Sequence, residues 1–226
     1  MREFIRGSLR EAVFGVQDGL VSTLGALTGI AEGTQSSQLV ALSGLVIIAV
    51  ESLSMTAGSY LSSKSQRQYL ERLLREEAEA IEKDPEGERR EIWAMYRARG
   101  YRDDEIAMVE RRLFSDKQLL LEDMAHKELG ISPQTLEEPL RNALVMGIAY
   151  AVGGFIPLLP YLMAALPMAM PSSIVGTLLT LFAFGALKGR VVKQVWWRGG
   201  LEMLGIAGLA ALAGFVIGHV GHRWLR

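Results

Sequence analysis

The stretch AVFGVQDGLVSTLGALTGI, residues 12–30, is apolar along most of its length and contains neither Lys nor Arg. A run of this kind can cross the hydrocarbon core of a bilayer, which takes roughly 20 mostly apolar residues. Asp18 lies within it, between Val16 and Leu20. Because an ionised carboxylate is costly at that depth, an acid in a membrane segment indicates a functional position.

Charge is concentrated in one part of the chain. The 226 residues are 50% hydrophobic and 22% charged, and 19 of the 25 acidic residues and 14 of the 24 Lys and Arg lie between Ser62 and Glu138. The net charge of −1 argues against a nucleic-acid partner, which needs a basic surplus. Since there is no cysteine, any bound metal would have to meet oxygen, nitrogen or methionine sulfur.

Five segments are long and apolar enough to span a membrane, and they lack the polar face of a soluble amphipathic helix: about 11–31, 38–61, 142–165, 171–188 and 200–220. We therefore expect an all-α membrane protein with five transmembrane helices and a helical insert between the second and third. The expected divisions are 1–61 for helices one and two, 62–138 for the insert, and 139–226 for helices three to five. Glycines spaced by four fit close helix–helix contacts, including dimerisation: Gly15/Gly19, Gly25/Gly29 and Gly214/Gly218.

Basic residues near the ends of the spans predict the orientation. They gather at Arg2, Arg6, Arg10, Lys188, Arg190, Lys193 and Arg198, whereas EGTQSSQ (32–38) has none. The positive-inside rule then places the N-terminus and residues 62–138 in the cytoplasm and the C-terminus outside, although Arg223 and Arg226 oppose this. In the absence of an extended targeting segment, we expect an integral protein of a prokaryotic inner membrane.

The charged insert is expected to form three helices. The first continues from the second span without a breaker and ends near Pro85 and Gly87. The second covers roughly Glu88 to Arg99, and the third starts at a cap made by Asp103 or Asp104 and continues to Leu129. No nucleotide-binding loop is present, so ATP-driven pumping has no support.

Two spans carry residues that could bind a cation. Glu11 and Asp18 are seven residues apart on one helix face, about 10 Å along the axis. Glu51 and Met55 are four apart and also share a face. Carboxylate oxygen with thioether sulfur suits a borderline cation such as Fe²⁺. A carboxylate can also hold a proton instead of the metal, which suits antiport. Glu11 could equally be a simple acid at the cytoplasmic interface. Met55 alone is more often a residue that faces lipid or packs in the core.

The insert offers a second group of potential metal ligands: Glu76, Glu77, Glu79, Glu88, Glu91, Met124 and Glu128. On composition alone, Glu- and Arg-rich helices are more often solvated surfaces with ion pairs between residues four apart. At the end of the fifth span, His219 and His222 are three residues apart. They could bind a metal, although histidines at an interfacial helix end are the more common case.

Four segments resemble the vacuolar iron transporter family, and the resemblance covers nearly the whole chain: GVQDGLVSTLGALTG (15–29), SLSMTAGSYLSSKSQ (52–66), KELGI (127–131) and AYAVGGFIPLLPY (149–161). It suggests a bacterial-type member of that family. It implies a five-span homodimer that exchanges cytoplasmic Fe²⁺ or Mn²⁺ for protons, without a tightly bound cofactor. It also implies that the cytoplasmic insert is a three-helix metal-binding domain, where Zn²⁺ or Co²⁺ are further candidate ions.

The resemblance also assigns residues. Asp18 matches the family's carboxylate on the first span, Glu11 an acid two turns earlier, and Met55 the methionine of the second span. In the insert, the matching ligand positions are Glu77, Glu88, Glu91, Met124 and Glu128.

Three positions depart from the family pattern. The family's glutamate on the second span falls on Ile47, and we expect Glu51, one turn later, to replace it. Ala80 and Ala125 stand where the family has a further ligand and a second methionine, and Glu79 is the nearest replacement for the former. The insert is therefore expected to bind fewer ions, or to bind them more weakly.

The sequence thus predicts a proton-coupled antiporter that exports Fe²⁺ or Mn²⁺ from the cytoplasm, with Asp18 and Glu51 as ligands and proton carriers. One alternative is a membrane-anchored protein that binds or senses divalent metals without transport. An enzyme such as a ferroxidase is disfavoured, because that chemistry usually uses Glu-x-x-His pairs and the insert has none.

Overall fold

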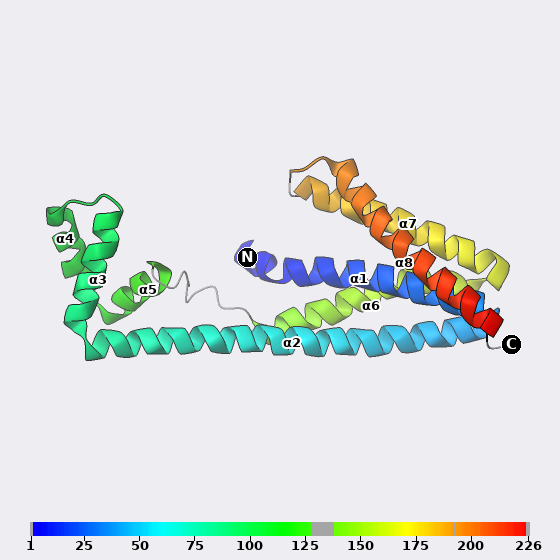
Figure 1. Cartoon of the computed structure of the whole chain (residues 1–226), viewed down its shortest axis with the longest axis horizontal. Coiled ribbons are helices and arrows are strands. Elements are labelled where there is room, and N and C mark those ends of the chain that lie inside the picture. Colours follow the sequence, from blue (N-terminus) through cyan, green and yellow to red (C-terminus); the bar gives the residue numbers. More distant parts are fainter. Residues whose placement is uncertain (1, 128–137, 192, 225–226) are drawn as a thin grey trace. The chain divides into compact units, whose positions relative to one another are not determined.

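The computed structural model describes residues 2–127, 138–191 and 193–224, and for residues 2–7 the backbone only. Five of its helices are long and apolar enough to cross a membrane: α1 (Arg2–Thr34), α2 (Ser37–Lys83), α6 (Pro139–Met163), α7 (Leu166–Val191) and α8 (Trp196–Trp224). Along the chain, three shorter helices follow the second span and precede the third (Figure 1): α3 (Pro85–Ala98), α4 (Asp103–Leu113) and α5 (Lys117–Lys127). The predicted fold class is confirmed.

The chain divides into two compact units. Residues Met1–Tyr60 and Leu140–Arg226 form the first, which we call the membrane unit, and Leu61–Pro139 form the second, the insert unit. Helix α2 contributes to both, as expected from its lack of a breaker. In the membrane unit, large apolar side chains such as Leu53, Leu209 and Ile217 remain exposed, which fits helices surrounded by lipid.

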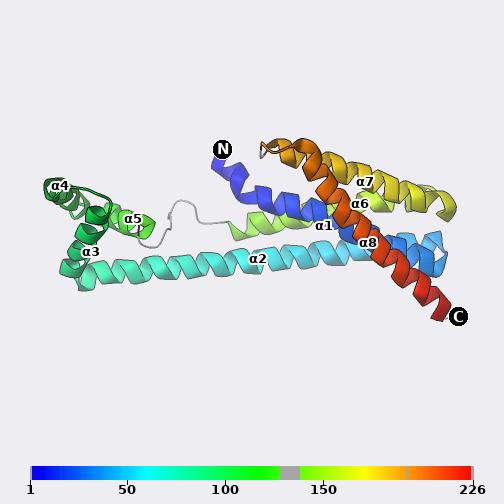
Figure 2. The ribbon, with the colours of Figure 1, turned by 45° about the horizontal axis from the view of Figure 1, so that its top comes forward.

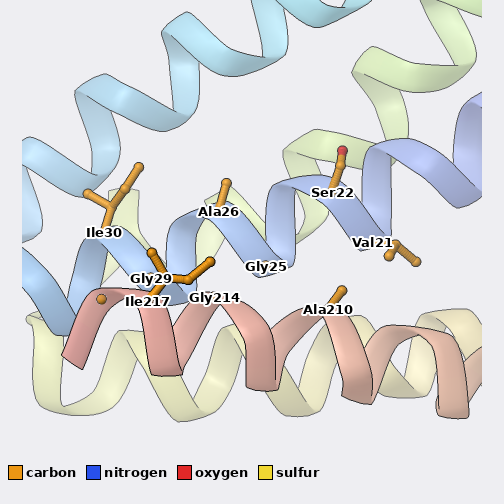
Figure 3. Close-up of a pocket in the computed structure, with 10 residues that line it drawn as sticks. Val21, Ser22, Gly25, Ala26, Gly29, Ile30, Ala210, Gly214 and Ile217 are labelled. Carbon is orange, nitrogen blue, oxygen red and sulfur yellow. The ribbon is translucent and has the colours of Figure 1, made fainter. Parts of the chain in front are cut away.

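Glycines allow α1 to approach two other helices closely. A Cβ atom added at Gly15 would lie 2.6 Å from the carbonyl oxygen of Met146 on α6. One added at Gly29 would lie 2.7 Å from the carbonyl oxygen of Gly214 on α8. Figure 3 shows Gly25 and Gly29 facing α8, which crosses α1 and also packs against α7 (Figure 2). These spaced glycines therefore make contacts within one chain, as expected for membrane helices.

Apolar side chains fill the space where the spans meet. One cluster joins α1, α7 and α8 and contains Leu20, Leu24, Leu181, Met203 and Ala207. The other joins α1, α2, α6 and α7 and contains Leu27, Ala31, Val40, Ile48, Leu158, Tyr161 and Ala169. Helix α1 belongs to both clusters, so its position is fixed along much of its length.

The helices of the insert unit differ from the prediction in two places. The second begins at Pro85 rather than Glu88, because the Asp84 side chain caps it by accepting the Gly87 N–H at 2.9 Å. The predicted cap at Asp103 or Asp104 is wrong. Both residues lie inside α4, and the Glu105 carboxylate accepts the N–H of the N-cap residue, Arg102, at 2.8 Å.

The predicted third helix is in fact two helices, α4 and α5. It is interrupted after Leu113, where Asp116 Oδ1 accepts the N–H groups of Gln118 and Leu119 at 3.0 and 3.3 Å. An acidic side chain that satisfies the first free N–H groups starts a new helix at this point. The predicted end of this helix, at Leu129, lies outside the described residues.

A small apolar core holds the insert unit together, with Ile81, Ile92, Ile106, Leu120 and Met124 among its members. Beside it, Glu110 forms an ion pair with Arg89 and accepts the indole N–H of Trp93 at 2.8 Å. The Arg89 guanidinium lies 4.1 Å from the centre of the Phe114 ring. Ion pairs and a cation–π contact therefore supplement the apolar core.

Candidate functional site

Asp18 occupies a partly buried position on α1 that α6 helps to form. One turn later, the Ser22 hydroxyl donates to the Asp18 carbonyl oxygen at 2.7 Å, and the Tyr150 hydroxyl of α6 lies 2.8 Å from the same Ser22 oxygen. A serine hydroxyl has a single hydrogen, and here the carbonyl accepts it, so Tyr150 must be the donor to Ser22. This chain of hydrogen bonds ties a fully buried tyrosine to the backbone of Asp18.

Glu51 brings a second carboxylate from α2. It interacts electrostatically with Asp18, and Tyr150 interacts with both acids. Met55 lies one turn beyond Glu51 and is half-buried, as is Ile47, one turn before it. Glu51 itself is exposed in the single chain. The structure therefore brings Asp18 and Glu51 into one electrostatic environment from two different spans.

Glu11 is more deeply buried than an acid at a helix start usually is. Only 2% of its side chain is exposed, although its Oε1 accepts a hydrogen bond from the largely exposed Arg10 at 2.8 Å. Within the described part of the chain, no donor reaches its Oε2. A buried carboxylate oxygen without a donor is costly, which is consistent with a place for a cation or proton.

The predicted ligands of the insert unit divide into a buried and an exposed group. Glu77, Glu88 and Met124 are buried. Glu76 and Glu91 are exposed, and Glu76 pairs with Arg72 at 3.4 Å. Glu128 lies outside the described residues. Only the buried group differs from an ordinary solvated helix surface.

Glu79, the nearest replacement for the ligand missing at Ala80, is exposed and forms an ion pair with Lys83. The Lys83 Nζ atom donates to its carboxylate at 2.8 Å, and this hydrogen bond holds the pKa of Glu79 below its usual range. A metal ion would have to compete with Lys83 for this carboxylate.

Across residues 2–127, 138–191 and 193–224, no three His, Asp or Glu side chains are grouped closely enough to hold a metal ion. In the membrane unit, Asp18 and Glu51 interact electrostatically with each other.

A groove of about 500 Å³ lies between α1 and α8, and Figure 3 shows the residues that line it. Its lining consists of glycines, alanines and aliphatic side chains, with Ser22 as the one polar side chain among them. Because it offers no charged ligand, this groove does not provide a cation site.

Two residues of the site escaped the sequence analysis, Ser22 and Tyr150. Both fall within segments that carry the family resemblance, and Ser22 is one turn from Asp18. The spacing alone could have identified Ser22. The role of Tyr150 depends on how α6 packs against α1, which periodicity does not reveal.

Comparison with known proteins identifies the family. The model of the VIT family matches residues 9–219. Vacuolar iron transporter 1 of Arabidopsis thaliana is 33% identical over 221 residues, which cover 97% of this chain and 88% of the relative. Vacuolar iron transporter 2 of Oryza sativa subsp. japonica is 33% identical over 216 residues, which cover 95% of this chain and 88% of the relative. A fungal relative from Arthroderma benhamiae, vacuolar iron transporter cccA, is 27% identical over 220 residues, which cover 92% of this chain and 77% of the relative. The five spans, the helical insert and these matches together show that the chain belongs to the VIT family.

Proposed function

We propose that this protein carries Fe²⁺, Mn²⁺ or both from the cytoplasm across the membrane in exchange for protons. The observation that carries the proposal is the electrostatic interaction between Asp18 on α1 and Glu51 on α2. The names of the curated relatives supply iron as the first substrate to consider.

Two neighbouring carboxylates within membrane spans provide a physical basis for exchange. When both are ionised they repel each other in a medium that screens charge poorly. Either a divalent cation or protons can remove that repulsion, but they compete for the same oxygens. Binding of one therefore releases the other, and this competition couples metal movement to proton movement.

Met55 provides selectivity in this scheme. Its position one turn from Glu51 allows a thioether to share an ion with the carboxylate. Sulfur favours Fe²⁺ over the hard cations Mg²⁺ and Ca²⁺, which prefer oxygen ligands alone. Glu11, buried nearer the start of α1, would be the earlier carboxylate on the path.

A homodimer would complete the site. Glu51 is exposed in the single chain although α2 is a candidate span, and a carboxylate facing lipid at that depth is costly. A second copy that covers α1 and α2 would exclude lipid and could add ligands from its own Asp18 and Glu51.

The insert, residues 62–138, would collect or sense cytoplasmic metal. Its buried carboxylates, Glu77 and Glu88, and the buried sulfur of Met124 support this role. Glu76, Glu79, Glu91 and Glu128 complete the predicted set. Fe²⁺ and Mn²⁺ are the expected ions, and Zn²⁺ or Co²⁺ could occupy the same ligands.

The distribution of basic residues supports a cytoplasmic N-terminus and insert and an external C-terminus. We further propose a bacterial-type member in a prokaryotic inner membrane. The plant and fungal relatives are named as vacuolar, so protein localisation in the source cell would test this proposal.

The second candidate function is a membrane-anchored metal sensor without transport. The buried acids of the insert unit, Glu77 and Glu88, favour it, since they lie outside the membrane unit. The transporter names of the relatives favour transport over both this alternative and an enzyme.

The test is uptake of Fe²⁺ and Mn²⁺ into proteoliposomes under an imposed pH gradient. Wild type should take up metal in proportion to the gradient, and both Asp18→Ala and Glu51→Ala should abolish uptake. Glu202→Ala is the matched control, because Glu202 is another acid on a membrane helix but belongs to α8. Full uptake by Asp18→Ala would refute the mechanism. No uptake by wild type, together with metal binding that Glu77→Ala removes, would favour the sensor.

A further inference from the structure

Two histidines join the ends of α1 and α8, far from Asp18. His219 Nδ1 lies 2.9 Å from Glu32 Oε1, and His222 Nδ1 lies 2.8 Å from the carbonyl oxygen of Gly33. Figure 1 shows this end of α8 beside the end of α1 that leads into α2. Glu32 is 14 residues beyond Asp18, about 21 Å along the helix axis. It therefore lies at the end of α1 opposite Glu11.

These contacts determine which nitrogen of each ring carries the proton. An ionised carboxylate and a backbone carbonyl can only accept a hydrogen bond, so Nδ1 must be the donor in both histidines. In a neutral imidazole, the other nitrogen, Nε2, then holds a free lone pair. In its neutral form, each ring thus offers Nε2 to a metal ion.

The same contacts resemble the outer shell of a histidine metal site. Histidines that bind metals usually donate their second N–H to a carboxylate or a backbone carbonyl, which fixes the tautomer and the ring orientation. Here Glu32 and Gly33 provide one acceptor of each kind. The Phe215 ring stacks on His219, with centroids 6.0 Å apart and an angle of 15° between the planes, and so limits rotation of that ring.

The two rings also project from the same helix face, because residues three apart on α8 are neighbours on its surface. Neither is sealed from solvent. Both histidines are partly exposed, and 45% of the His219 side chain is accessible. A hydrated cation could therefore reach them and exchange.

We propose that His219 and His222 bind one borderline divalent cation through their Nε2 atoms, at the end of α1 and α8 opposite Glu11. Imidazole nitrogen suits Fe²⁺ and Zn²⁺ better than Mg²⁺ or Ca²⁺. Among the described residues, no third His, Asp or Glu side chain is grouped with these two rings, so in this proposal water completes the shell of the ion. If the proposed transport holds, this site receives the ion after it leaves Asp18.

Cu²⁺ is a suitable probe, because it has the highest affinity of the first-row divalent ions and electron spin-echo spectroscopy counts the imidazoles bound to it. The full chain, purified in detergent, would be titrated with Cu²⁺ alone, and Zn²⁺ would then be added as a competitor. The chain has three histidines, so His126→Ala leaves only His219 and His222. This variant keeps the proposed site unchanged. Any imidazole bound to Cu²⁺ in it must come from His219 or His222.

Cu²⁺ bound to His126→Ala should show two imidazoles, and Zn²⁺ should displace it. His219→Ala and His222→Ala should each lose the two-imidazole signal, and Glu32→Ala should weaken binding about tenfold by releasing the His219 ring. Asp18→Ala should leave the signal unchanged, so failed transport and a failed site can be told apart. One imidazole or none on His126→Ala would overturn the proposal.

Discussion

The membrane unit and the insert unit hold their helices together in different ways. In the membrane unit, α1 and α8 meet through backbone, at pairs such as Gly29 and Gly214. In the insert unit, α3 and α4 share a small apolar core, and long charged side chains supplement it, with Arg89 paired to Glu110. The two units are parts of one chain, so the difference reflects their surroundings.

The two units hold their helices together differently because they displace different solvents. Lipid tails are as apolar as leucine, so burying more apolar surface between helices gains little in a bilayer, and close backbone contact takes its place. A small unit in water has a limited apolar core and gains from capping boxes, ion pairs and aromatic contacts. Substitutions that add volume should therefore harm the first unit most, and those that remove charge should harm the second.

The largest effect is expected from Gly214→Ala. The added methyl group would collide with the carbonyl group of Gly25, which is backbone and cannot rotate away. We expect a loss of about 3 kcal/mol, near the upper end of the usual cost of overpacking. Gly208→Ala on the same helix is the control, since no atom lies within 4 Å of its added Cβ. Thermal unfolding of the full chain in detergent measures both, and equal melting temperatures would contradict the glycine contact.

The next effect concerns Glu110→Gln in the insert unit. The change removes the charge that pairs with Arg89 and weakens the bond from Trp93, and the carboxylate is only 17% exposed. We expect the local free energy of opening to fall by about 2 kcal/mol. Hydrogen exchange of the α3 and α4 peptides in the full chain reports this value.

Glu86→Gln provides the matched control. Glu86 pairs with the same arginine at 3.3 Å, but its side chain is 77% exposed. Exposed pairs contribute little, so the change in opening free energy should stay below about 0.5 kcal/mol. Similar exchange in the two variants would show that burial does not determine the strength of these pairs.

The Glu110 carboxylate should also make the stability of the insert unit sensitive to acid. The hydrogen bond from Trp93, followed by the contact with Arg89, lowers the pKa of Glu110 below its ordinary value. A carboxyl with a lowered folded pKa stabilises the fold above its ordinary pKa, and this contribution disappears as the pH falls through the folded pKa. The difference between wild type and Glu110→Gln should therefore shrink in that range, in hydrogen exchange with labelling times adjusted for pH. A difference that stays constant down to the lowest pH would argue against this origin.

A smaller effect than that of Glu110→Gln is expected from Asp116→Ala, which removes the cap of α5. The loss of an N-cap usually costs about 1 kcal/mol, and Asp116→Asn should restore most of it because asparagine caps equally well. Faster exchange confined to the first turn of α5 would support the cap. Unchanged exchange in Asp116→Ala would show that packing alone ends α4 and starts α5.

The sequence was sufficient to predict most of the fold. The five spans and the unbroken α2 follow from runs of apolar or helix-forming residues, which are local features. The interruption at Asp116 was missed because the helical pattern continues through Leu113, Leu120 and Met124. Whether an aspartate caps a helix or lies on its surface depends on backbone conformation that composition does not show.

The site was less accessible to prediction. Asp18 and Glu51 stand out because each is an acid in an apolar run, and in the structure the two are near enough to interact electrostatically. The burial of Glu11 and the bond between Tyr150 and Ser22 depend on which face of α1 meets α6. The pairing of His219 with Glu32 joins residues 187 positions apart and is set by helix packing alone.

The glycines between α1 and α8 also limit how the gene can change. Every single-base change of a glycine codon that alters the residue adds a side chain, and alanine is the smallest of these. Even a Cβ atom at Gly29 or Gly214 would press against the backbone of the other helix. No residue that a single-base change can encode therefore fits at these positions without moving a helix. Invariance at these positions among descendants of this gene would therefore reflect steric exclusion. It should not be counted as a sign of contact with the transported ion.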